Sequence, residues 1–167
     1  SVVMPVYNGS KFIPEAVDNI LSQNYPALEI ILVDDGSQED IKAVVDQLPV
    51  DVRYFRQENQ GPAAARNWGI EDASGEYIAF LDVDDLWPEN TLFKLLEVHR
   101  EKGNLEVVHG HAQLMELDEA TGAFNYTGNP EEAFPYYIGA GLYRKTAFEK
   151  NGLFDAELMF AEDSDWY

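Results

Sequence analysis

The sequence contains no cysteine and few basic residues, and both absences exclude classes of function. Without cysteine the chain can form neither disulfides nor thiolate metal sites, which fits a reducing compartment. Only 11 Lys and Arg residues stand against 31 Asp and Glu residues, giving a formal net charge of −20. Because most of this surface would repel a phosphate backbone, we expect no nucleic-acid partner.

Long hydrophobic runs are also absent. No stretch approaches the roughly 18 apolar residues of a membrane span, and the first residues lack the basic flank and apolar stretch of a signal peptide. The 167 residues, 46% of them apolar, suit one domain with a substantial core. Ser1 is not an initiator Met and Tyr167 falls inside an apparent motif, so we expect residues 1–167 to be a single domain truncated at its C-terminus.

Strand-like and helix-like segments alternate along the chain up to Gly103. The strand-like runs are residues 2–4, 29–33, 52–56 and 77–81, and the helix-like stretches between and after them are 10–24, 40–48, 61–70 and 89–102. Such alternation predicts an α/β fold with a doubly wound, mostly parallel sheet, Rossmann-like, with right-handed crossovers. His99 falls on the outer part of the last of these helices, where we expect it to be solvated.

The pattern changes after Gly103. Residues 105–117 are strand-like, and a turn at 118–122 leads into another strand-like stretch, which predicts a hairpin or antiparallel edge. Residues 142–144 follow a Gly-Ala-Gly turn, and a short helix over 145–150 ends at Asn151-Gly152. We therefore expect a small antiparallel part in the C-terminal region.

Polar side chains follow three of the predicted parallel strands. Pro5, Tyr7 and Asn8 come after the first, residues 34–37 after the second, and residues 82–85 after the fourth. The carboxyl ends of parallel strands share one edge of a sheet, and ligands bind in the crevice there. The joint placement predicts a nucleotide site at this edge, although each turn taken alone is common.

The acidic residues after the fourth strand are the most informative group. If the strand continues for two more residues, Asp82 and Asp84 lie on one face, and Asp85 turns away or is placed by the following bend. Two such carboxylates repel each other by a few kcal/mol at an effective dielectric of about 20, so they need a proton, a base or a divalent cation. All-oxygen ligands favour Mg²⁺ or Mn²⁺ over zinc. The alternative is a solvated acidic turn in which Asp85 helps to start the next helix.

Five segments resemble the family 2 glycosyltransferases of the GT-A fold, which transfer a sugar from a nucleotide donor with inversion at the anomeric carbon. The segments are residues 3–8, 31–37, 59–67, 80–85, and 152–157 leading to 162–166. They cover essentially the whole chain in order. The resemblance implies a hexosyltransferase-like enzyme that moves a sugar from a nucleoside-diphosphate donor, a UDP-sugar, to an acceptor hydroxyl.

The resemblance also assigns residues to the nucleotide. Pro5 and Tyr7 would line the base pocket, and Asp35 would accept a hydrogen bond from the base ring. Arg66 would lie near the base or the phosphates, and Asp84 would contact the ribose.

A metal and a general base complete this assignment. Asp84 or Asp85 would hold Mn²⁺ or Mg²⁺ on the diphosphate, where the cation neutralises charge on the leaving group. The frame of the Asp-x-Asp motif over residues 82–85 stays open. Asp163 would be the catalytic base, with Glu162 and Asp165 as competing candidates. Inversion requires no enzyme nucleophile.

Acceptor and location are implied more coarsely. The resemblance implies a carbohydrate or lipid-linked acceptor, chosen by a variable loop around residues 123–137, and a role in polysaccharide biosynthesis. It implies a cytoplasmic protein at the inner face of the membrane, with peripheral association through residues missing from this sequence. The alternative is a non-catalytic module that binds nucleotide-sugar or carbohydrate, and the retention of Asp163 favours the enzyme.

Overall fold

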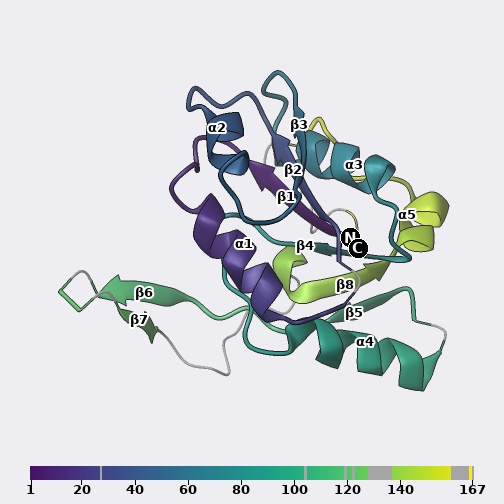
Figure 1. The fold of residues 1–167 in the computed structure, drawn as a ribbon. Coiled ribbons are helices and arrows are strands. Elements are labelled where there is room, and N and C mark those ends of the chain that lie inside the picture. Colours follow the sequence, from purple (N-terminus) through teal and green to yellow (C-terminus); the bar gives the residue numbers. More distant parts are fainter. Residues whose placement is uncertain are drawn as a thin grey trace.

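The computed structural model describes residues 1–26, 28–103, 105–118, 120–121, 123–127, 137–158 and 166 (Figure 1). The strands are β1 (Val2–Val6), β2 (Ile30–Asp34), β3 (Arg53–Arg56), β4 (Tyr77–Phe80), β5 (Val107–His109), β6 (Met115–Asp118), β7 (Ala123–Tyr126) and β8 (Gly141–Arg144). The helices are α1 (Ile13–Ser22), α2 (Ile41–Val45), α3 (Pro62–Asp72), α4 (Thr91–Lys102), α5 (Lys145–Asn151) and the 3-10 helix η2 (Ile138–Ala140).

Six of the strands form one sheet in the order β3-β2-β1-β4-β8-β5. The first four in this order run parallel, and β8 pairs antiparallel with β4 on one side and β5 on the other. This arrangement confirms the predicted doubly wound, mostly parallel α/β sheet with a small antiparallel part.

Helices cover both faces of the sheet because the side chains of β1 alternate between them. Val2, Met4 and Val6 join a core cluster with residues of α1, α2 and α4. Val3 points the other way, into a second cluster with residues of α3 and α5. Both faces of the central strands are therefore buried, as the apolar runs of the sequence indicate.

The region after Gly103 contains a hairpin, as predicted, but its first strand is shorter than expected. The strand-like run over residues 105–117 splits into β5, which joins the main sheet, and β6, which pairs with β7. The N–H of Gly110 donates to the carbonyl of Ala140 at 2.8 Å, which ties the chain to η2 as it leaves the sheet. The β6–β7 hairpin projects from the body of the molecule (Figure 1).

The prediction for His99 was wrong. Its side chain is fully buried, with Nε2 2.9 Å from the carbonyl oxygen of Leu142 and the ring against Tyr77. The physical reason is helical spacing, because His99 continues the stripe of Leu92, Leu95 and Leu96 that α4 packs against the sheet.

Among the described residues, no helix is long and apolar enough to cross a membrane.

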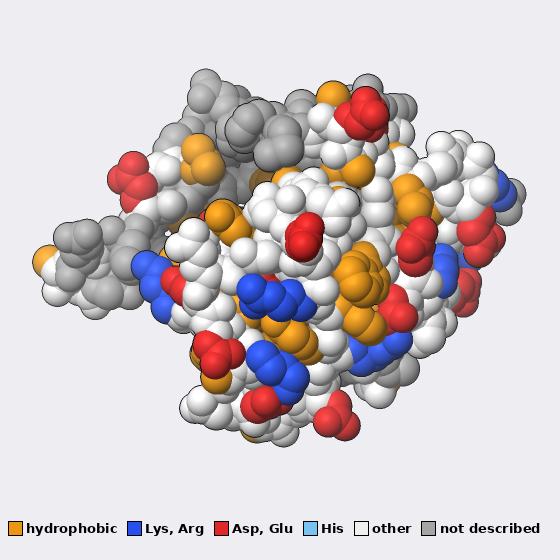
Figure 2. All heavy atoms as spheres, turned by 90° about the horizontal axis from the view of Figure 1, so that it is seen from above, with side chains coloured by type: hydrophobic (Ala, Val, Ile, Leu, Met, Phe, Trp, Pro, Cys, Tyr) orange, Lys and Arg blue, Asp and Glu red, His pale blue; other side chains and the backbone are white. Residues whose placement is uncertain are grey.

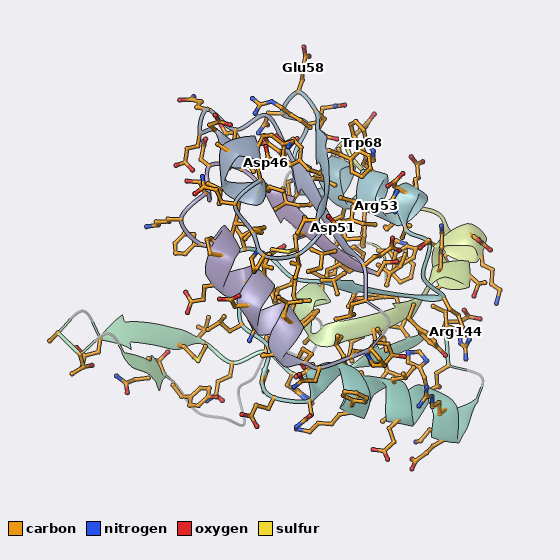
Figure 3. The ribbon with its side chains drawn as sticks, in the orientation of Figure 1. Asp46, Asp51, Arg53, Glu58, Trp68 and Arg144 are labelled. Carbon is orange, nitrogen blue, oxygen red and sulfur yellow. The ribbon has the colours of Figure 1, made fainter. Side chains whose placement is uncertain are left out.

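Ion pairs and hydrogen bonds connect neighbouring elements at the edge of the sheet where the parallel strands begin. Arg53, labelled in Figure 3, contacts Glu29 at 2.9 Å and also pairs with Asp72. Burial raises the pKa of Glu29, but hydrogen bonds from Ser1, Ser74 and Arg53 outweigh it and lower the pKa to about 2. These contacts hold the start of β2 and the end of α3 together. Arg53 begins β3, and Glu58, at the top of Figure 3, follows the other end of that strand.

Candidate active site

The three strand ends that carry polar residues meet at one edge of the sheet. The N–H of Asn8 donates to Ser37 Oγ at 2.9 Å, and the N–H of Gln38 donates to Asn8 Oδ1 at 2.8 Å, which joins the turns after β1 and β2. A Cβ at Gly9 would lie 2.8 Å from Cγ2 of Val83, so the turn after β4 packs on the turn after β1. The sequence therefore predicted this convergence correctly.

Tyr7 and Pro5 differ in how much they present to solvent. Tyr7 is 53% exposed at this edge, which leaves its ring free to contact a ligand. Pro5 is buried within β1, where it pairs in register with Val33. Of the two residues predicted to line a base pocket, Tyr7 is the one with an accessible face.

Asp35 is buried and anchors the loop that leads into α3. One carboxylate oxygen, Oδ1, accepts hydrogen bonds from Gln57 Nε2 at 2.7 Å and from the N–H of Gln60 at 2.8 Å. The other, Oδ2, accepts from the N–H of Gly61 at 2.9 Å. An ionised carboxylate has about four acceptor positions, so one remains for a further donor.

Asp34, which sequence reasoning passed over, fixes the loop beside Asp35. Its fully buried carboxylate accepts hydrogen bonds from the N–H of Ser37 at 2.8 Å, the hydroxyl of Tyr54 at 2.8 Å and Nη1 of Arg56 at 2.6 Å. Gly36 in this loop has φ +78°, a conformation that favours glycine, and a Cβ there would lie 2.7 Å from the backbone nitrogen of Asn59. The loop is therefore held before any ligand arrives.

Arg66 is buried, and its described contacts place it on an acid of the turn after β4. Nη2 donates to both carboxylate oxygens of Asp82, at 2.9 and 3.0 Å. The guanidinium thus balances one of the three acidic side chains of this turn. Its predicted contact with the base or phosphates stays a prediction.

The expected continuation of the fourth strand does not occur. β4 ends at Phe80, and the N–H of Asp85 donates to the carbonyl of Asp82 at 3.0 Å, which closes a turn. The pairing of β4 with β1 also ends at Phe80, whose partner is Val3, whereas β1 continues its pairing with β2 as far as Val6. As a result Asp82, Asp84 and Asp85 point from a turn and not from alternating faces of a strand.

The other two acids of the turn have different environments. Asp84 is exposed at the tip and makes no hydrogen bond with the part of the chain that the structure describes. Asp85 is half-buried, and the hydroxyl of Tyr137 donates to its Oδ2. Burial, and then repulsion by Asp82 and Asp84, raises the pKa of Asp85 to about 6 despite this hydrogen bond.

Tyr137 is a site residue that sequence reasoning missed. Its hydroxyl lies between two acids of the turn, since it donates to Asp85 and is 3.4 Å from Oδ2 of Asp82. Burial, and then the nearby carboxylates, raises the pKa of this phenol, so it remains a donor. No local pattern marks it, because it lies 52 residues from Asp85 in the sequence.

The donor set of the turn fits a hard divalent cation shared with a substrate. The described residues include no cluster of three or more His, Cys, Asp or Glu that could hold a metal alone. Asp84 and Asp85 supply carboxylate oxygens only. Proteins typically bind Mg²⁺ through one or two carboxylates, while substrate phosphates and water complete the coordination shell, and Mn²⁺ accepts the same oxygen ligands.

A cavity of about 710 Å³ begins at Asp84 and Asp85 and extends to the base of the β6–β7 hairpin. Trp87 forms part of its wall, held by a hydrogen bond from Nε1 to the carbonyl of Gly139 at 2.6 Å. Exposed Leu114 and Tyr126 belong to the hairpin side. The space next to the acidic turn is thus large enough for a sugar or another small polar group.

The surface seen in Figure 2 carries acidic and basic side chains side by side. The described residues of this face form no continuous basic patch.

Asp163, the predicted base, and its competitors Glu162 and Asp165 lie outside the described residues. The described segment that precedes them is fixed, because the side-chain amide of Asn67 donates to the carbonyl of Phe154 at 2.8 Å and accepts from its N–H at 2.9 Å. Trp166, which follows them, packs against Phe148 and Phe154.

Comparison with curated proteins points to one family. An uncharacterized glycosyltransferase of Rickettsia felis is 39% identical over 175 residues, which cover 98% of this chain and 28% of that protein. The glycosyltransferase GlyG of Streptococcus pneumoniae is 42% identical over 130 residues, 75% of this chain and 42% of GlyG. The chain therefore spans less than half the length of these two relatives.

Solved structures share the fold over nearly the whole chain. S. aureus TarS 1–349 in complex with UDP has a TM-score of 0.77 at 23% identity, covering 99% of this chain and 52% of that one. The mannosyltransferase PcManGT from Pyrobaculum calidifontis in complex with GDP-Man and Mn²⁺ has a TM-score of 0.73 at 22% identity, covering 99% and 49%. These likenesses confirm the predicted GT-A fold class. Since residues 1–150 also match the model for glycosyl transferase family 2, the chain belongs to that family.

Proposed function

We propose that residues 1–167 form a single domain that transfers a sugar from a nucleoside-diphosphate donor, a UDP-sugar, to an acceptor hydroxyl with inversion. The observation that carries the proposal is the convergence of Tyr7, Asp35 and the acidic turn at one edge of the sheet, next to a cavity of about 710 Å³. A preformed polar edge of this kind is where open α/β sheets bind nucleotides.

Two features of the edge suit the nucleotide. The exposed ring of Tyr7 offers a flat face on which a base can stack, and Asp35 has one acceptor position left for a base N–H. TarS has been solved with UDP and with UDP-GlcNAc, and PcManGT with GDP-Man. These relatives of the fold support a nucleotide-sugar donor, and uracil is our choice of base.

Asp84 and Asp85 are proposed to hold Mn²⁺ or Mg²⁺ against the donor diphosphate. When bound, the cation neutralises the charge that builds on the departing nucleoside diphosphate. Arg66 occupies Asp82 with two hydrogen bonds, which leaves Asp84 and Asp85 as the acids available for this role. The structure of PcManGT with Mn²⁺ supports a divalent metal in this fold.

Asp163 is proposed as the general base. It would take the proton of the acceptor hydroxyl while the acceptor oxygen forms its bond to the anomeric carbon. On the opposite face the bond from that carbon to the diphosphate breaks, and the electron pair leaves with the nucleotide. A carbohydrate or lipid-linked acceptor would enter from the cavity at Trp87 and Tyr126, and membrane association would involve residues outside this sequence.

Calorimetric titration of the protein with UDP, GDP and dTDP, each with and without Mn²⁺, tests the donor and metal assignments. We expect UDP to bind best and Mn²⁺ to strengthen its binding. Asp84→Asn should remove most of the strengthening, whereas Asp51→Asn, an exposed acid labelled in Figure 3, should not change it. Equal binding of all three nucleotides without any effect of Mn²⁺ would contradict the proposal.

A second experiment tests the base and the stereochemistry. Asp163→Asn should abolish sugar transfer and leave UDP affinity nearly unchanged. Loss of both in equal measure would give Asp163 a binding role and would favour a module that only binds nucleotide-sugar. NMR of the product should show the inverted anomer, and retention would exclude the single-displacement mechanism.

A further inference from the structure

The hydroxyl of Tyr137 lies within hydrogen-bonding distance of two acids of the turn after β4. It donates to Oδ2 of Asp85 and lies 3.4 Å from Oδ2 of Asp82. A phenol has one proton to give, and the closer carboxylate receives it. Oδ2 of Asp85 is therefore engaged, and Oδ1 is the oxygen left for another partner.

The ring that carries this hydroxyl is held in place. A Cβ at Gly139 would lie 2.8 Å from Cε1 of Tyr137, so the ring rests directly against the glycine. The N–H of Ala140 donates to the carbonyl of Tyr137 at 3.0 Å, which fixes its backbone at the start of η2. Tyr137 is thus oriented by packing and by the backbone of η2.

The element η2 is in turn tied to the loop that carries Asp85. Trp87 lies two residues after Asp85, and its Nε1 donates to the carbonyl of Gly139 at 2.6 Å. The loop and η2 are therefore joined twice, once through Trp87 and once through the Tyr137 hydroxyl. Two connections fix the distance and the rotation of the Asp85 carboxylate better than one.

We propose that Tyr137 is a positioning residue for the cation, an inference that rests on the proposed function. Its hydroxyl holds Oδ2 of Asp85 and leaves Oδ1 to bind Mn²⁺ or Mg²⁺. Partners that orient a metal ligand typically contribute about 10- to 100-fold to metal affinity. Without the hydroxyl, Asp85 would be free to rotate away from its acidic neighbours, and the ligand set would have to be ordered when the cation binds.

Tyr137→Phe tests this role with a readout that does not require turnover. Electron paramagnetic resonance of free Mn²⁺, measured with saturating UDP, should show an Mn²⁺ affinity about 10- to 100-fold lower than in the wild type. UDP affinity without metal should stay the same. The matched control is Tyr25→Phe, which removes a phenol hydroxyl from a ring that packs against Phe93, away from the acidic turn, and should not alter Mn²⁺ affinity.

A second variant keeps the hydroxyl but displaces it. Gly139→Ala places a methyl group where the Tyr137 ring lies, and like Tyr137→Phe it should lower the affinity for Mn²⁺. Gly110→Ala is its control, because the nearest atom to the new Cβ is the Ala140 carbonyl oxygen at 3.5 Å, an ordinary contact.

The outcomes separate the two proposals. Wild-type Mn²⁺ affinity in Tyr137→Phe, or tighter binding, would overturn the positioning role and leave the proposed function standing. A wild-type protein that binds UDP without taking up Mn²⁺ would overturn both the metal assignment and this inference.

Discussion

Nη2 of Arg66 lies 2.9 and 3.0 Å from the two carboxylate oxygens of Asp82, and this pair joins α3 to the turn after β4. The arginine is buried and the aspartate is partly exposed. The pair places one positive charge beneath three neighbouring acids. It therefore influences both the stability of the turn and the acids left for a cation.

Breaking this pair should be costly. Arg66→Met is expected to lower the free energy of unfolding by about 3 to 5 kcal/mol, because it leaves Asp82 without its cation beside two other acids. Asp82→Asn in the same chain should restore part of the loss, since the unbalanced charge is then gone. Urea unfolding of the two single variants and the double variant measures the coupling. Strictly additive losses would show that the two side chains do not stabilise each other.

Asp85 should destabilise the metal-free protein above its raised pKa. Its folded-state pKa of about 6 exceeds the roughly 3.9 of an unfolded chain, so the folded state holds a proton that the unfolded state has lost between these values. Stability therefore falls as the pH rises from about 4 to about 6, and the whole cost is present above 6.

Asp85→Asn tests this sign. The amide oxygen can still accept the Tyr137 hydrogen bond, so the variant should be more stable by about 1 to 3 kcal/mol at pH 8 and by less at pH 5. Urea unfolding at the two pH values measures the difference, with Asp51→Asn as the matched change of charge. A gain of the same size at both pH values would contradict ionisation of Asp85 as its cause.

Asn19 of α1 should stabilise the loop that follows the acidic turn. Its amide donates to the carbonyl of Trp87 at 3.0 Å and accepts from its N–H at 2.8 Å. Asn19→Ala leaves both backbone groups without these partners and should cost about 1 to 3 kcal/mol. Asn19→Asp keeps the acceptor and should cost less.

The same variants report on the cation. If the loop places Asp85, Asn19→Ala should also weaken Mn²⁺ uptake in the presence of UDP. Ser22→Ala, on the exposed side of the same helix, serves as the control and should change stability by no more than about 0.5 kcal/mol. Unchanged stability in Asn19→Ala would mean that other contacts suffice to hold the loop.

The order of the elements could be predicted because local patterns determine it. Apolar runs of strand length, Gly-Pro at the start of α3 and Gly103 at the end of α4 mark their elements without help from distant residues. The convergence of polar residues followed from the sheet being parallel. The burial of His99 could also have been predicted from helical periodicity, since the spacing of Leu92, Leu95 and Leu96 places His99 on the buried face.

Contacts between distant residues could not be predicted in the same way. The apolar run through Leu81 gives no sign that β4 ends at Phe80, because the register between β4 and β1, whose last pair is Phe80 with Val3, is a contact between distant residues. Tyr137 reaches Asp85 only once η2 is docked, and Arg66 meets Asp82 only once α3 covers the sheet. The partner of a charged or phenolic side chain is set by tertiary packing, which local periodicity does not encode.

Asn67 of α3 holds the described segment that leads toward Asp163. Its amide pairs with both backbone groups of Phe154, at 2.8 and 2.9 Å, across 87 residues of sequence. A displacement of about 1 Å in a catalytic group can cost about 100-fold in rate, so removal of this anchor tests whether the segment that follows Phe154 supplies the base.

We therefore expect Asn67→Ala to lower kcat by about 10- to 100-fold while UDP affinity changes little, because both described hydrogen bonds of the Asn67 amide go to the backbone of Phe154. Steady-state kinetics and UDP calorimetry on the same preparation separate the two effects. The control is Asn151→Ala, which removes one amide hydrogen bond within α5, to the Ala147 carbonyl, and should leave kcat near the wild-type value. A parallel loss of kcat and UDP affinity in Asn67→Ala would place the effect of this anchor in the nucleotide site and would weaken the assignment of the base to the segment beyond Phe154.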